Sequence, residues 1–163
     1  QFDKLIEAYS KSILPKSNIH LVLLGEGERK MTLQKLAKEK KIEDKVHFLG
    51  YKNNPFKYIK KAKFFVLSSL NEGLPNVILE SLACGTPVVA FDCLSGPSEM
   101  IQHQENGLLV ENQNIEKLTE AMNLFVEDRN LYRYCKQNAP QSVQSFSVLA
   151  IGQQWLNLMK ISL

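Results

Sequence analysis

The stretch NEGLPNVILESLACGTPVVA, residues 71–90, organises the rest of the chain. Apolar residues at 77–83 give one segment enough apolar surface to lie as a helix on a sheet. Gly85 ends that helix, and the apolar residues 88–91 predict the next buried strand. Residues 64–67 (FFVL) predict another strand just before the stretch. The unit is therefore strand, loop, helix, strand.

This unit places a loop with a glycine and a helix N-terminus at the carboxyl end of a parallel strand, where ligands bind in open α/β sheets. Unpaired N–H groups of the first helical turn favour an anion such as phosphate. Glu72 lies before the helix and Glu80 within it, and both carboxylates can accept hydrogen bonds from hydroxyls. A ligand with one anionic end and many hydroxyls is expected, and a nucleotide sugar has this chemistry.

The two glutamates, in the context of residues 71–90, resemble the donor-site motif of family 4 retaining glycosyltransferases. The resemblance covers nearly the whole chain, through segments in the family's order: FDKLIEA (2–8), LVLLGEG (21–27), VHFLG (46–50), SGPSEMI (95–101) and ENGLLV (105–110). It implies the C-terminal donor-binding domain of a two-domain enzyme, spanning residues 1–163, with the N-terminal acceptor domain outside this sequence.

The resemblance also implies roles for individual residues. Glu72 would contact hydroxyls of the donor sugar and Glu80 the ribose hydroxyls, and these two form the expected catalytic pair. The expected donor-binding residues are Gly73, Leu74, Pro75, Asn76, Val77, Gly25, Phe48 and Leu49. The backbone near Phe48 and Leu49 would pair with the base.

Strands alternate with helices along the 163 residues, so we predict a Rossmann-like three-layer α/β/α sandwich with a mostly parallel sheet. Strands are expected at 19–24, 46–49, 64–67, 88–91 and 108–110, and helices at 28–41, 55–62, 115–127, 131–137 and 148–160, with a short one from Ser98. A loop around Pro140 is the expected soft boundary. Ser98 or an immediate neighbour is the expected N-cap of its helix.

Composition limits the class of function. A net charge of +3 is too small to argue for nucleic acid, and no apolar run reaches the roughly 20 residues of a membrane span. The three cysteines have no metal-like spacing and are expected to be reduced thiols. His20, His47 and His103 are expected to be structural. The lysines at 57, 60, 61 and 63 form either a solvated face or a contact with an anionic membrane.

No Asp-x-Asp is present, so we expect neither a metal nor another cofactor. The resemblance implies retaining transfer of a hexose from a UDP-sugar, or secondly GDP-mannose, to a glycan or lipid-linked acceptor. The setting would be bacterial surface polysaccharide or lipopolysaccharide synthesis, cytoplasmic and compatible with peripheral attachment to the membrane. The basic residues that neutralise the family's leaving group would lie upstream, so this domain alone would be inactive.

Two other functions are compatible with an α/β domain. A nucleotide-sugar epimerase would need acid and base residues from outside this sequence, and the Leu-Pro form of the motif disfavours it. A regulatory nucleotide-binding domain would need acidic residues at the ends of its early strands, which the sequence lacks. The Gly25-Glu26-Gly27 loop is either a phosphate-binding loop or a tight turn from strand to helix.

Overall fold

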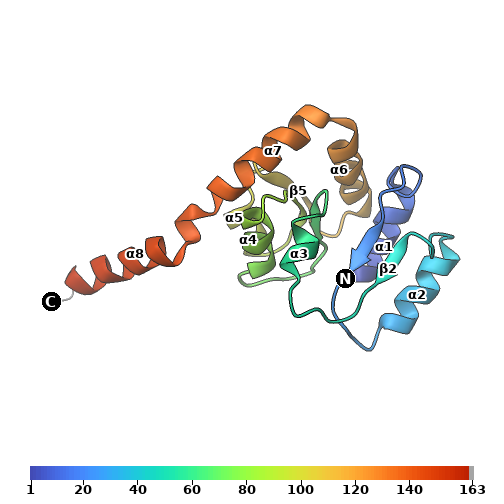
Figure 1. The fold of residues 1–163 in the computed structure, drawn as a ribbon, viewed down its shortest axis with the longest axis horizontal. Coiled ribbons are helices and arrows are strands. Elements are labelled where there is room, and N and C mark those ends of the chain that lie inside the picture. Colours follow the sequence, from blue (N-terminus) through green and yellow to red (C-terminus); the bar gives the residue numbers. More distant parts are fainter. Residues whose placement is uncertain (162–163) are drawn as a thin grey trace.

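The computed structural model describes residues 1–161, whose fold is drawn in Figure 1. Five short strands alternate with helices over residues 2–127. The strands are β1 Leu21–Leu23, β2 Val46–Phe48, β3 Phe65–Leu67, β4 Val88–Asp92 and β5 Gly107–Glu111. The helices are α1 Phe2–Lys11, α2 Lys30–Glu39, α3 Phe56–Ile59, α4 Asn76–Ala83, α5 Pro97–Met100, α6 Ile115–Glu127, α7 Arg129–Ser142, the 3-10 turn η1 Gln144–Phe146, and α8 Val148–Ile161.

The three-stranded sheet β3-β4-β5 lies between two hydrophobic cores, and all its ladders are parallel. Successive residues of a strand point to opposite faces. Val89 and Phe91 of β4 accordingly face the core formed with α1 and α6, whereas Val88 and Ala90 face the core formed with α4, α5 and α7. All four side chains are fully buried. This arrangement confirms the predicted three-layer α/β/α class.

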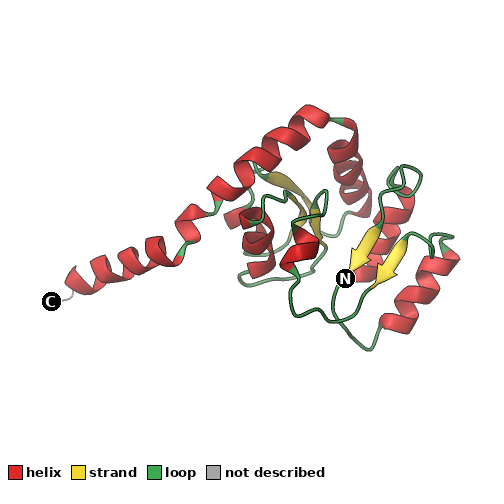
Figure 2. Ribbon diagram, in the orientation of Figure 1, coloured by secondary structure: helices red, strands yellow, loops and turns green. Residues whose placement is uncertain are grey.

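The first two strands form a separate parallel pair, with Leu21 opposite Val46 and Leu23 opposite Phe48. Helix α2 covers this pair through Leu33 and Ala37. We expected one sheet, but within residues 1–161 no ladder joins β1 to β3, and Figure 2 shows β1 and β2 standing apart from the other strands.

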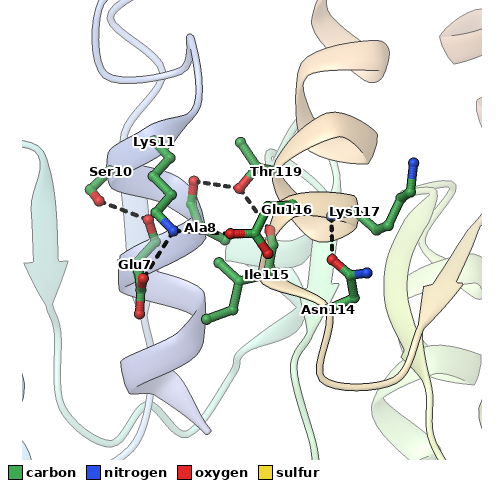
Figure 3. Close-up of polar contacts among 9 residues, drawn as sticks. All are labelled: Glu7, Ala8, Ser10, Lys11, Asn114, Ile115, Glu116, Lys117 and Thr119. Atoms are coloured by element: carbon green, nitrogen blue, oxygen red, sulfur yellow. Dashed lines mark hydrogen bonds and ion pairs between the residues drawn. The ribbon is translucent and has the colours of Figure 1, made fainter.

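Helix α1 is held to α6 and to the loop before it (Figure 3). Thr119 Oγ1 donates to Ala8 O at 3.2 Å, and Lys11 Nζ lies 3.4 Å from Glu116 Oε1. The side chain of Lys4 also donates to Gln113 Oε1. Helix α6 starts where predicted, because Asn114 Oδ1 accepts from Lys117 N at 3.0 Å.

The predicted loop around Pro140 is wrong, because α7 continues through Pro140 to Ser142. A proline inside a helix leaves one carbonyl without its donor. Packing compensates here: Ala139 is fully buried in the core shared with α4, and the Pro140 ring lies 3.8 Å from where a Cβ on Gly85 would be. The local sequence signal for a break is thus overridden by tertiary contact.

Helix α8 extends away from the body of the molecule (Figure 1). It carries several exposed apolar side chains, including Val148, Leu149 and Trp155. None of the helices in the described part of the chain is both long enough and apolar enough to cross a membrane.

Candidate functional site

The loop after β3 and the start of α4 form the predicted helix N-terminus. Ile78 N donates to Pro75 O at 2.8 Å, so the amides of Asn76 and Val77 precede the first intrahelical bond. Pro75 stands just before the helix, at its N-cap position. Ile78 and Leu82 are fully buried and hold α4 against the sheet. The exposed amide end is therefore fixed by the core beneath it.

Glu72 is held in place by two serines. Ser69 Oγ donates to Glu72 Oε1 at 2.6 Å, and Ser95 Oγ donates to the Glu72 main-chain oxygen at 2.9 Å. Burial raises the pKa of the nearby Cys93 thiol, and the charge of Glu72 raises it further. Cys93 therefore stays protonated at neutral pH, and it is not a nucleophile at this site.

Glu80 lies about one helical turn into α4 and is half-buried. Its carboxylate has no hydrogen bond or ion pair with another residue of the described chain, so it is available to a ligand. Glu72, Glu80 and Val77 line one cavity of about 720 Å³. The structure thus brings together the two glutamates that the sequence singled out, on the same side of the loop.

Gly73 and Leu74 form the outer edge of the loop. Leu74 is 56% exposed. A Cβ on Gly73 would meet no atom within 4 Å, and Gly73 is not among the residues with positive φ. The fold itself therefore does not require glycine at position 73. The space beside its Cα is open.

The remaining predicted donor-binding residues lie at the ends of β1 and β2. Gly25 has φ +108° and donates its N–H to Gly50 O at 2.9 Å, so the structure supports a tight turn there. Leu49 N donates to Leu23 O at 3.0 Å, beyond the last paired residue, Phe48. None of these three residues lines the cavity that holds the glutamates, although Leu24, next to Gly25, does.

Gly96 belongs to the segment that the sequence indicates as a turn into a helix, and the structure places it against the loop before α4. It has φ +91°, and a Cβ there would lie 2.6 Å from Pro75 Cδ and 2.7 Å from Gly73 O. Only glycine allows the segment before α5 to approach the Gly73–Pro75 loop this closely. Gly96 also replaces Ser98 as the N-cap, because α5 already begins at Pro97 and Gly96 N donates to Glu99 Oε1 at 3.4 Å. The dipeptide Gly96-Pro97 is the sequence signal for this helix start, because proline favours the first helical position.

The three histidines, with Lys57 and Lys63, contact neighbouring side chains or main chain, and His20, Lys61 and Lys63 also line the cavity that holds the two glutamates. His20 Nδ1 lies 2.6 Å from His47 Nε2 in a stacked pair, and His103 Nδ1 accepts from Leu109 N at 3.1 Å. The Nζ atoms of Lys57 and Lys63 lie over the rings of Tyr58 and Tyr132. All three cysteines are free. Within residues 1–161, no three His, Cys, Asp or Glu side chains gather into a group that could hold a metal ion.

Comparison with known proteins decides the family. Residues 1–142 match the model of the family described as glycosyl transferases group 1. The chain belongs to this family. This chain is 39% identical, over 95% of its length, to an N-acetylgalactosaminyltransferase of Campylobacter jejuni whose name specifies a diphospho-undecaprenol-linked sugar.

Solved structures of similar fold support the same family. A TarM variant of S. aureus, in complex with fondaparinux, alpha-GlcNAc-glycerol and UDP, superposes with a TM-score of 0.89 at 30% identity over 97% of this chain. HepE of Anabaena in complex with UDP gives 0.87 at 25% identity over 98%. The group 1 chain spans less than half of these proteins: 42% of the Campylobacter enzyme, 32% of TarM and 44% of HepE.

Proposed function

We propose that this group 1 domain binds the nucleotide-sugar donor of a hexosyltransferase, with a UDP-sugar favoured. The observation that carries the proposal is that Glu72 and Glu80 line one cavity beside the N-terminus of α4. The UDP complexes of TarM and HepE support uracil as the base. GDP-mannose is the second candidate donor.

Each end of the donor has a matching group in this site. The amides of Asn76 and Val77 would receive the diphosphate, where the helix dipole also favours negative charge. Glu80, with no partner in the described chain, would accept hydrogen bonds from the ribose hydroxyls. Glu72, oriented by Ser69 and Ser95, would accept from the sugar hydroxyls. The open space beside Gly73 would let the phosphate or sugar approach the backbone.

The proposed reaction is metal-independent transfer with retention at the anomeric carbon. The bond from that carbon to the diphosphate oxygen breaks, and a bond to the acceptor oxygen forms on the same face. The leaving phosphate oxygen can take the acceptor proton, so this domain need not supply a base. The amides at the start of α4 would stabilise the charge on the leaving group. The acceptor, a glycan or a lipid-linked sugar, would bind to a second domain.

A calorimetric titration of the full-length protein with UDP and with GDP tests the proposal. We expect saturable binding of UDP and a loss of about tenfold in affinity for Glu80→Gln, because the charged acceptor of a hydrogen bond becomes neutral. Glu127→Gln is the matched control, since Glu127 is an exposed helical glutamate outside this cavity. Tighter binding of GDP would change the assigned base. Equal affinities of both variants and the wild type would contradict the proposed role of Glu80.

A further inference from the structure

Charge is distributed unevenly along the chain. Residues 45–71 contain six lysines and residues 129–163 contain four basic residues, and neither segment contains an Asp or Glu. All 17 acidic residues therefore lie in the rest of the chain, together with the other ten basic residues. The small net charge of +3 hides this segregation. A surface with one sign of charge creates a field that attracts partners of the opposite sign.

The two acid-free segments meet in the fold at Tyr132 of α7. The Nζ atom of Lys63, just before β3, lies 4.6 Å from the centre of the Tyr132 ring, and Nζ of Lys136 lies 5.8 Å from it. The ring is held in place because it packs edge-on against Phe125, which is fully buried. Two ammonium groups from distant parts of the sequence are thus fixed beside one ring.

Further cations adjoin this point along the chain, and we call the whole set the basic face. Its members lie on α3, between α3 and β3, or on α7: Lys57, Lys60, Lys61, Lys63, Arg133 and Lys136. All except Lys63 are exposed, and in the described residues none of them forms a salt bridge. Cations elsewhere do pair, as when Lys117 Nζ lies 2.8 Å from Glu120 Oε2. The basic face therefore keeps its positive charge for a partner outside the described chain.

A bilayer with anionic headgroups suits the basic face better than a nucleic acid does. Five of the six cations are lysines, which act as point charges, whereas arginine is the preferred residue for nucleic acids. An anionic bilayer attracts each lysine near its surface. Phe56, on α3 with Lys57, is 47% exposed and offers an apolar side chain to the headgroup region. A flat bilayer can meet cations from two helices at once.

The basic face and the two glutamates lie at opposite ends of β3. Lys61 and Lys63 precede this strand, whereas Glu72 follows it. All three line the same cavity, so the lysines stand at one end of it and Glu72 at the other. A membrane that contacts the basic face would therefore leave the N-terminus of α4 open to a donor.

We propose that the basic face is a docking surface for an anionic lipid bilayer. The lysines lie against the headgroups, Phe56 enters the headgroup region, and the carboxyl end of the sheet points away from the membrane. The attraction is electrostatic, so it weakens as added salt screens the charges. This inference concerns where the protein is held, and it does not rest on the proposed donor binding.

Co-sedimentation of the full-length protein with vesicles, in the absence of nucleotide, tests the proposal. The vesicles contain either phosphatidylcholine alone or phosphatidylcholine mixed with anionic phosphatidylglycerol. We expect binding to the mixed vesicles only, and weaker binding as salt is added. The triple variant Lys57→Gln, Lys60→Gln, Lys136→Gln should bind about 100-fold more weakly, because each lysine near an anionic surface contributes about fivefold to the affinity.

The matched control removes the same charge from another surface. Lys30, Lys38 and Lys40 are exposed lysines on and next to α2, among acidic residues such as Glu39. The triple variant Lys30→Gln, Lys38→Gln, Lys40→Gln should therefore bind the mixed vesicles with close to the wild-type affinity. Circular dichroism of both triple variants checks that they remain folded.

Three results would overturn the proposal. Equal losses in the two triple variants would show that the vesicles respond to net charge and not to the basic face. Equal binding of the wild type to both kinds of vesicle, or to neither, would show that anionic lipid is not the partner. Binding of an RNA duplex in place of vesicles, lost in the first triple variant, would assign the basic face to nucleic acid. Because nucleotide is absent, a failure of UDP binding would leave the vesicle result unchanged.

Discussion

The three-stranded sheet and the β1–β2 pair differ in how completely their strands are enclosed. In β4, four consecutive side chains are fully buried, with a strand on each side and helices on both faces. In β1 only Leu23 is buried, and the strand lines the cavity that also holds Glu72 and Glu80. The comparison indicates that the sheet under the two glutamates is the rigid part. The β1–β2 pair, with Gly25, Phe48 and Leu49 at its carboxyl end, is less completely enclosed.

The strongest test of this difference compares one strand residue from each region. Phe91→Ala should reduce the free energy of unfolding by about 3–5 kcal/mol, because it removes a fully buried ring from the main core. Val22→Ala, at a half-exposed position, should cost less than about 1 kcal/mol in residues 1–163. Urea unfolding followed by circular dichroism measures both. Similar losses would show that the two regions are equally well packed.

A second test compares two glycines. Gly96→Ala should destabilise the protein by about 1–3 kcal/mol, because a Cβ would collide with Gly73 O while φ stays positive. Displacement of the Gly73–Pro75 loop should also weaken UDP binding. Gly27→Ala is the control in the other region, where a Cβ meets nothing within 4 Å, and it should change stability by less than about 0.5 kcal/mol. A neutral Gly96→Ala would show that this close approach is not needed.

The local sequence patterns predicted most helices and strands, but not how the strands pair into sheets. The bounds of α6 were predicted without error, because Asn114 and the apolar period mark them. The two glutamates share a cavity, as the sequence suggested. The divided sheet was not predicted, because the spacing of apolar residues within β1 and β3 says nothing about which strand lies beside each. Ser69 and Ser95 were missed as supports of Glu72, since loop serines are common and their partners are set by the fold.

The smallest expected effect concerns Tyr9, which joins α1 to the β1–β2 region. Its hydroxyl donates to Ile19 O at 2.8 Å, so Tyr9→Phe should cost about 1 kcal/mol at neutral pH. Hydrogen exchange should become faster in β1 and β2 but not in β4. Uniform acceleration over all five strands would contradict a local role.

The same hydroxyl makes stability depend on alkaline pH. Burial, with a contribution from the charge of Asp44, raises the pKa of Tyr9 to about 12, above the value of 10.0 for an exposed phenol. The stabilisation is complete below pH 10 and is lost as the pH rises through 12, because the unfolded chain releases the proton first. Tyr9→Phe should show a smaller loss over this range. Burial also raises the pKa of Cys135 to about 11. Its ionisation adds a loss of stability that the wild type and Tyr9→Phe share.

The extended helix α8 has a consequence for spectroscopy. Trp155 is the single tryptophan of the sequence, and it is 61% exposed on a helix that projects from the body. Its fluorescence in this chain therefore reports the surroundings of α8, and it should change little when the core around Phe91 unfolds. An emission shift to shorter wavelength would instead signal that another surface has covered α8. The protein thus carries a built-in optical probe for docking of this helix.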